Sequence, residues 1–109
     1  MKSGDEAKIP YLHFMKTGFV YILTNKNNTT LYVGVTSDLP GRIWQHRSKK
    51  YPKSFTARYS LYKLVYWEAF PSIIAAIARE KQLKGGSRQK KIEFINSRNP
   101  EWADLFEAL

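Results

Sequence analysis

Residues 18–46 read GFVYILTNKNNTTLYVGVTSDLPGRIWQH, and this stretch determines the fold of the chain. Two apolar, β-branched runs at about 19–24 and 31–36 flank a loop rich in Asn and Thr, which is the pattern of a β-hairpin. Side chains alternate along a strand, so the first run presents residues 19, 21 and 23 on one face and residues 20 and 22 on the other. The hairpin therefore predicts a sheet with two faces to cover.

A helix is expected directly after the hairpin, over about 39–48. Ser37 or Asp38 caps it, and a proline follows in the first turn, where a missing N–H costs least. Arg42 and His46 are four residues apart and therefore lie on one face of this helix.

The remaining residues predict one more strand and three more helices. A basic loop without a clear period covers 49–60, and a strand follows at 61–70. Helices are expected at 73–84, where Gly85-Gly86 stops the first one, at 87–97, and from a cap at Asn99-Pro100 to Ala108. The last helix is expected to close the core with Trp102, Leu105 and Phe106. The order β-β-α-β-α-α-α predicts an α+β fold, a small three-stranded and mainly antiparallel sheet covered by helices.

The composition describes one small domain. The 109 residues suffice for a modest core at 18–109, preceded by an N-terminal arm at 1–17 whose apolar part, 9–14, is expected to dock on it; Met15 is an alternative start. The chain has no Cys, which excludes disulfides, thiolate zinc sites and thiol catalysis. It has neither the ~20-residue apolar run of a membrane span nor a secretory signal, so we expect a cytoplasmic protein without membrane partners.

The chain is strongly basic. Its 18 Lys and Arg against nine acids give a net charge of +9 and a pI near 9.9, which favours nucleic acid as partner. The basic residues form two groups in the sequence: Arg42, His46, Arg47, Lys49, Lys50, Lys53 and Arg58, then Lys81, Lys84, Arg88, Lys90 and Lys91. The aromatic residues Trp44, Tyr51, Phe55 and Tyr59 interleave the first group. Such a mixture suits phosphate contacts with base stacking, although Tyr51, Phe55 and Tyr59 equally suit anchors in a core or loop.

One carboxylate lies in an unexpected position. In the helix at 73–84, Glu80 falls inside the apolar arc of Ile73, Ile74, Ala76, Ile77 and Leu83 when residues are placed about 100° apart. A buried carboxylate is costly without a partner, so Glu80 must pair with a cation, bind a metal or escape at the edge of the sheet. Lys84, four residues on, offers a local ion pair. The alternative is a hard cation held by one carboxylate and waters, the usual mode for Mg²⁺.

The ordered set of these residues resembles the GIY-YIG endonuclease superfamily, specifically its small single-domain bacterial members. The first motif appears as Gly18-Phe19-Val20-Tyr21 and the second as Tyr32-Val33-Gly34. Arg42, His46 and Glu80 match the family's helix arginine, its second-ring residue and its metal-binding glutamate. The resemblance covers about residues 18–106. Asn96 and Asn99 compete for the asparagine that ends the family's site, and Asn99 is preferred because its Asn-Pro-Glu-Trp run resembles close relatives.

The resemblance implies hydrolysis of DNA phosphodiester bonds with one Mg²⁺ or Mn²⁺ held by Glu80. Tyr32 is expected to activate the attacking water and Tyr21 to position it or the phosphate, although the two roles are exchangeable. Because a tyrosine with its ordinary pKa of about 10 is a poor base, this expectation requires nearby positive charge to lower that pKa. Arg42 would neutralise charge on the phosphate, and His46 would relay a proton or assist Tyr32.

Contacts with nucleic acid are expected from the second-motif glycine Gly34, which marks either a bulge or a close approach of phosphate to the backbone. Further contacts are expected from Arg47, Lys49, Lys50, Lys53, Arg58, Lys84 and Arg88. We expect weak sequence specificity, a role in DNA repair or processing, RNA as an alternative substrate, and a monomer or a homodimer. The rivals are a non-catalytic nucleic-acid-binding module with this fold and an interaction domain that uses the terminal aromatic helix.

Overall fold

The computed structural model of the chain describes residues 16–109. The expected N-terminal arm, with its docking segment 9–14 and the alternative start at Met15, lies almost wholly outside the described residues. Within 16–109, no helix has the length and the apolar character that crossing a membrane requires.

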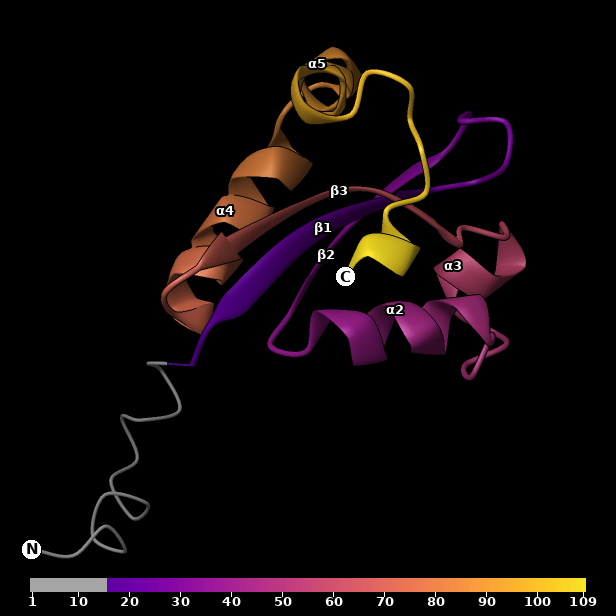
Figure 1. Cartoon of the computed structure of the whole chain (residues 1–109), viewed down its shortest axis with the longest axis horizontal. Coiled ribbons are helices and arrows are strands. Elements are labelled where there is room, and N and C mark those ends of the chain that lie inside the picture. The colour runs from indigo at the N-terminus through magenta and orange to yellow at the C-terminus, as the bar shows by residue number, and fades with distance from the viewer. Residues whose placement is uncertain (1–15) are drawn as a thin grey trace, which may run out of the picture.

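A three-stranded sheet forms the middle of the molecule (Figure 1). It consists of β1 (Gly18–Thr24), β2 (Leu31–Thr36) and β3 (Lys63–Phe70). The strand order is β2-β1-β3 and both pairings are antiparallel, so β1 is central and β2 is an edge strand. The predicted hairpin and the α+β fold are confirmed.

Helices cover both faces of this sheet (Figure 1). The helices α2 (Leu39–Arg47) and α3 (Phe55–Arg58) lie on one side, and α4 (Ile73–Gly85) and α5 (Arg88–Arg98) lie on the other. A Ser or Asp side chain caps each of the four by accepting a backbone N–H from the first turn; these residues are Asp38, Ser54, Ser72 and Ser87.

The core divides between the two faces. One cluster joins Val20, Ile22, Val33, Val65 and Tyr66 to Ala76, Leu83 and Ile95 of α4 and α5, and the other joins Tyr21, Leu23 and Leu64 to Leu39, Ile43 and Leu61. Strict alternation along the strand expected at 61–70 would place Leu61, Val65 and Trp67 on one face and Tyr62, Leu64 and Tyr66 on the other, and the structure departs from this at Leu64 and Val65. The register shifts between Ile22 and Leu23, and this β-bulge puts the consecutive residues Val65 and Tyr66 in one cluster.

Two segments differ from the predicted elements. The presumed loop at 49–60 contains the single helical turn α3, which Ser54 caps through the backbone N–H of Ala57. The predicted helix from Asn99 to Ala108 is instead an irregular segment followed by one 3₁₀ turn, η2 (Phe106–Ala108). Asn99 caps the end of α5, so it does not start a helix.

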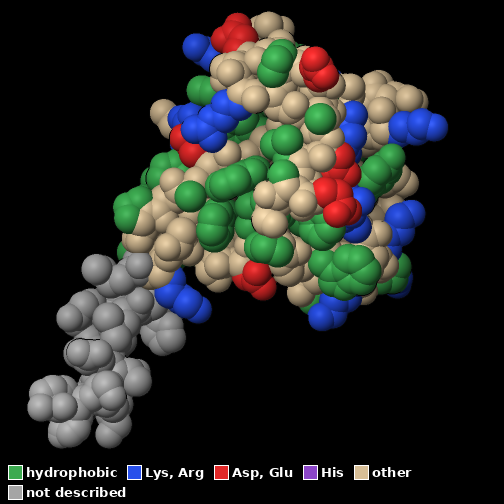
Figure 2. Space-filling view, viewed as in Figure 1, with side chains coloured by type: hydrophobic (Ala, Val, Ile, Leu, Met, Phe, Trp, Pro, Cys, Tyr) green, Lys and Arg blue, Asp and Glu red, His purple; other side chains and the backbone are tan. Residues whose placement is uncertain are grey.

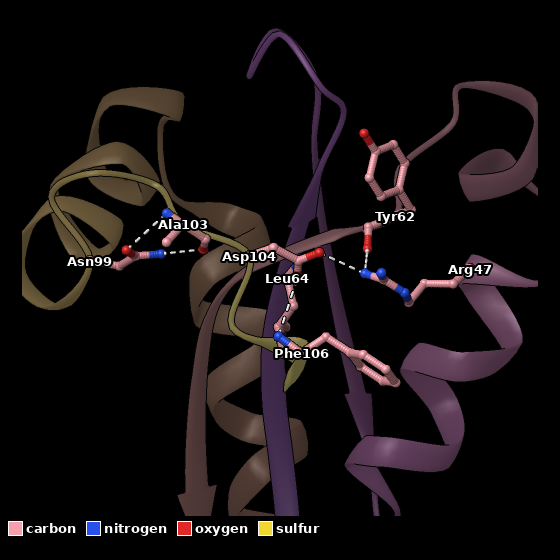
Figure 3. Close-up of polar contacts among 7 residues, drawn as sticks. All are labelled: Arg47, Tyr62, Leu64, Asn99, Ala103, Asp104 and Phe106. Atoms are coloured by element: carbon pink, nitrogen blue, oxygen red, sulfur yellow. Dashed lines mark hydrogen bonds and ion pairs between the residues drawn. The ribbon is translucent and has the colours of Figure 1, made fainter. Parts of the chain in front are cut away.

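The C-terminal segment runs along β3 (Figure 3). The backbone N–H of Leu105 donates to the carbonyl of Leu64 over 2.7 Å, and the Asp104 carboxylate accepts from the Leu64 N–H over 3.2 Å. Backbone pairing with a strand thus replaces the expected helix. The expected packing of the aromatic residues is confirmed, since Trp102 packs on one core cluster and Leu105 and Phe106 on the other.

Candidate active site

The site begins with Tyr21 and Gly34, which face each other in the pairing of β1 with β2. The Tyr21 side chain is 1% exposed, and its ring extends across Gly34. A Cβ atom at Gly34 would overlap the ring and its hydroxyl oxygen. The phenol of the central strand therefore passes over the edge strand only because position 34 has no side chain.

His46 of α2 holds this phenol from the helix side. Its Nε2 atom lies 2.8 Å from the Tyr21 hydroxyl, and its Nδ1 atom lies 2.8 Å from Thr56 Oγ1 of α3. The Thr56 hydroxyl is in turn 3.2 Å from Ser54 Oγ. Four side chains from β1, α2 and the α3 turn thus form one continuous hydrogen-bonded chain.

Burial governs the protonation of both ring systems. Burial, assisted by the charge of Arg42, lowers the pKa of His46 to about 4, so the imidazole is neutral near pH 7 and uses one nitrogen as donor and one as acceptor. Burial also raises the pKa of Tyr21 to about 12; Tyr32 and Glu80 add to this rise, and Arg42 opposes it. Tyr21 therefore does not meet the condition of a lowered pKa that is expected of the tyrosine acting as base.

The second tyrosine, Tyr32, lies on the more open side of this pair. Its ring centroid is 6.3 Å from that of Tyr21 and 5.6 Å from that of His46, and it is partly exposed where Tyr21 is buried. Of the two tyrosines, Tyr32 is the one that a molecule at the surface reaches first.

Glu80 acts on the site from α4, because its charge adds to the rise of the Tyr21 pKa. Its side chain is 13% exposed, and its carboxylate lies 2.6 Å from the Lys84 ammonium, so the local ion pair considered from the sequence is present. Part of the predicted apolar arc is wrong, because Ile74 and Ile77 are 55% and 37% exposed while Ala76 and Leu83 are buried.

The described residues of this site offer a metal ion one carboxylate, that of Glu80. Within residues 16–109, no group of three or more His, Cys, Asp or Glu side chains is placed to hold a metal ion. Glu80 supplies a single hard oxygen ligand group, which suits an Mg²⁺ whose other ligands are waters and phosphate oxygens. Lys84 occupies this carboxylate in the structure, and its side chain is 53% exposed, so solvent reaches the ammonium that a metal would displace.

Residues 17–93 match the family described as the GIY-YIG catalytic domain. The chain belongs to the GIY-YIG family. A UPF0213 protein of Syntrophus aciditrophicus is 37% identical over 87 residues, which cover 80% of this chain and 98% of the relative. Another UPF0213 protein, from Staphylococcus haemolyticus, is 38% identical over 84 residues, covering 77% of this chain and 100% of the relative.

A solved structure shares the fold. The solution NMR structure of a UPF0213 protein from Bacillus halodurans superposes with a TM-score of 0.52 at 32% identity, covering 81% of this chain and 92% of the other. The sequence-based assignment to the GIY-YIG family and to its small α+β fold is therefore confirmed. Membership gives a nuclease-type domain and nucleic acid as the general class of partner.

Five of the six predicted catalytic residues of this GIY-YIG domain converge. Tyr32, Arg42 and Glu80 each contribute to the pKa of the Tyr21 phenol. His46 forms a hydrogen bond of 2.8 Å with the hydroxyl of Tyr21. Arg42 also donates to Gln45 Oε1 over 2.8 Å, which orients the guanidinium on α2.

The sixth residue, Asn99, has a structural role. Its Nδ2 donates to the carbonyls of Val65 and Ala103, and its Oδ1 accepts from the Ala103 N–H. The competing Asn96 accepts from the Trp102 indole over 2.7 Å. Both amides therefore hold the C-terminal segment.

The predicted phosphate-binding residues divide into free and engaged side chains. Arg47 is engaged, since its guanidinium pairs with Asp104 over 2.7 Å and donates to the Tyr62 carbonyl (Figure 3). Lys84 pairs with Glu80, and Arg88 lies 3.5 Å from the Asn28 carbonyl. The exposed set between α2 and the end of α3 is Lys49, Lys50, Lys53 and Arg58.

Figure 2 shows Lys and Arg mainly around the periphery of one face and hydrophobic side chains in its middle.

Sequence reasoning missed Thr56 and Ser54. The Ser-Phe-Thr-Ala run has a capping serine three residues before the N–H that it accepts, which is the signal that could have revealed α3. No local pattern links Thr56 to His46, because their bond depends on the packing of α3 beside α2.

Proposed function

We propose that this GIY-YIG domain is an endonuclease that hydrolyses DNA phosphodiester bonds with one Mg²⁺ or Mn²⁺. The observation that carries the proposal is that His46 of α2 lies 2.8 Å from the Tyr21 hydroxyl, while Tyr32 of β2, Arg42 of α2 and Glu80 of α4 all act on the pKa of the same phenol. Tyrosine, arginine and carboxylate groups together supply a proton acceptor, a phosphate ligand and a metal ligand, which phosphodiester hydrolysis needs.

Tyr32 is the proposed proton acceptor for the attacking water. Tyr21 suits this role less well, because its raised pKa keeps the phenol protonated near neutral pH and His46 already binds its hydroxyl. A protonated Tyr21 donates a hydrogen bond instead, to the water or to a phosphate oxygen. Neutral His46 orients that phenol, and Thr56 fixes the ring of His46.

Arg42 and Glu80 handle charge. The planar guanidinium of Arg42 binds phosphate oxygens and offsets the charge that grows on them. Glu80 is the residue that would hold the metal, which when bound acts as a Lewis acid on the phosphate. Contacts through lysine and arginine read phosphates more than bases, so we propose weak sequence specificity, suited to DNA repair or processing.

A cleavage assay tests the proposal. Wild type, Tyr32→Phe and the control Tyr62→Phe are incubated with single-stranded, duplex and branched DNA in Mg²⁺, Mn²⁺ or EDTA. Tyr62 is a matched control because it is 36% exposed and stacks only on Arg47 among the described side chains. We expect metal-dependent cutting by wild type and Tyr62→Phe and its loss in Tyr32→Phe. Equal cutting by all three would reject the assigned role of Tyr32.

The second candidate is a binding module that keeps the fold without catalysis. The observation that favours it is the Glu80–Lys84 pair, which already neutralises the carboxylate without any metal. This candidate predicts salt-sensitive DNA binding with no cutting in any metal by wild type.

A further inference from the structure

The α3 turn presents two aromatic side chains to solvent. Phe55 and Tyr59 are 47% and 50% exposed, although both carry large aromatic rings. They are four residues apart and therefore share a side of the turn, whereas Thr56 and Ala57 point inward and are buried. The same turn that anchors His46 through Thr56 thus displays an aromatic surface outside the protein.

This aromatic surface is continuous with the candidate active site. The Tyr59 and Phe55 ring centroids are 4.7 Å apart, and Phe55 stacks on Tyr32 with centroids 6.3 Å apart and ring planes inclined by 26°. Tyr32 then packs its edge against His46 at 5.6 Å. An exposed row of rings therefore leads directly from the surface to the Tyr21–His46 pair.

The charges around this row suit a polyanion. Lys49, Lys50, Lys53 and Arg58 are exposed here, and the Arg58 guanidinium lies 5.9 Å from the Tyr59 ring centroid. No Asp or Glu occurs in the sequence between Asp38 and Glu68, so α2 and α3 contribute no acidic side chain. Exposed rings among cations are the combination that binds bases and phosphates of a single strand.

We propose that Phe55 and Tyr59 form a stacking platform for an unpaired DNA base next to the phosphate held at the Tyr21–His46 site. This inference rests on the proposed function for the placement of the phosphate. Bases in a duplex are covered on both faces by their neighbours, so only an unpaired, unstacked base offers a face to these rings. The platform therefore selects DNA with unpaired nucleotides over continuous duplex.

The test uses binding without cutting. An oligothymidine that carries one 2-aminopurine, either single-stranded or annealed to its complement, is titrated in EDTA with wild type, Phe55→Leu, Tyr59→Leu and the control Trp44→Leu. Trp44 is 61% exposed on α2 but, among the described residues, lies outside the row of contacting rings formed by Tyr59, Phe55, Tyr32 and His46, which makes it a matched exposed aromatic. Phe55→Tyr keeps a ring and serves as the conservative variant.

We expect wild type, Trp44→Leu and Phe55→Tyr to quench the 2-aminopurine fluorescence on binding, and the two platform variants to lose the quenching and bind roughly 10-fold more weakly. Equal quenching and affinity for all variants, or tighter binding of duplex than of single strand, would overturn the platform. The nuclease proposal is judged separately: quenching as expected, with no cutting in Mg²⁺, leaves the platform standing and rejects catalysis.

Discussion

Position 34 requires a glycine, because the ring of Tyr21 occupies the space that a Cβ atom would take. We predict that Gly34→Ala pushes this ring away from His46, destabilises the fold by about 1–3 kcal/mol through overpacking and lowers activity. Urea unfolding measures the loss of stability. A spectroscopic titration of the phenols measures the displacement of the ring, since Tyr21, with its pKa of about 12, should lose its proton at a lower pH in the variant.

Gly85→Ala is the control for that change. A Cβ at Gly85 would meet nothing within 4 Å, so we expect little change in stability. Equal stability of the two variants would contradict the role assigned to Gly34.

His46 makes folding stability depend on pH. Its pKa is about 4 in the folded protein against an ordinary 6.5, so the unfolded chain binds the proton more tightly. Its contribution is fully present above about pH 6.5 and is lost as pH falls towards 4, with a total of at most about 3 kcal/mol. We predict that urea unfolding of wild type shows this loss and that His46→Gln shows a shallower pH dependence; parallel curves would contradict it.

At the scale of elements, the sequence predicted whatever depends on neighbours in the chain. The hairpin follows from two apolar runs, α2 from its cap at Asp38, and the end of α4 from Gly85-Gly86. The α3 turn has a local signal in its Ser54 cap, but its placement beside α2 was not predictable, because that depends on the bond between Thr56 and His46. Asn99 suits either end of a helix. It caps the end of α5, because the residues after it pair with β3 through the bond from the Leu105 N–H to the Leu64 carbonyl and do not continue as a helix.

The candidate site was predictable to the same extent. The ordered motifs brought Tyr21, Arg42, His46 and Glu80 to attention, and the structure places them together. The hydrogen bond between His46 and Tyr21 and the raised pKa of that phenol were not predictable, because both depend on burial created by packing α2 on the sheet.

The C-terminal segment offers a prediction at this scale. Asp104 accepts from the backbone N–H groups of Leu64 and Phe106 and pairs with Arg47 (Figure 3). We predict that Asp104→Ala lowers the free energy of unfolding by about 1–3 kcal/mol, because two backbone donors lose their acceptor. Asp104→Asn should cost less, since it keeps an acceptor oxygen. Urea unfolding compares the two, and equal losses would contradict the backbone role.

At the scale of the whole molecule, the charge of +9 makes DNA binding depend on salt. We predict that replacing Lys49, Lys50, Lys53 and Arg58 with Gln reduces the slope of log K against log salt by about three on single strands, at roughly 0.7 for each of four contacts. Replacing the exposed Lys81 and Lys90 on α4 and α5 is the control. A larger effect of the control would move the binding surface to α4 and α5.

The central claim is that the group of residues around Tyr21 cuts DNA and does not only bind it. The most direct measurement compares binding and Mg²⁺-dependent cleavage in parallel for wild type, Glu80→Gln and the exposed control Glu93→Gln. The account predicts that Glu80→Gln binds DNA at least as tightly as wild type, because it removes a negative charge, and cuts about 100-fold more slowly or worse. Cleavage by Glu80→Gln at the rate of wild type, or no cleavage by wild type in any metal, would contradict it.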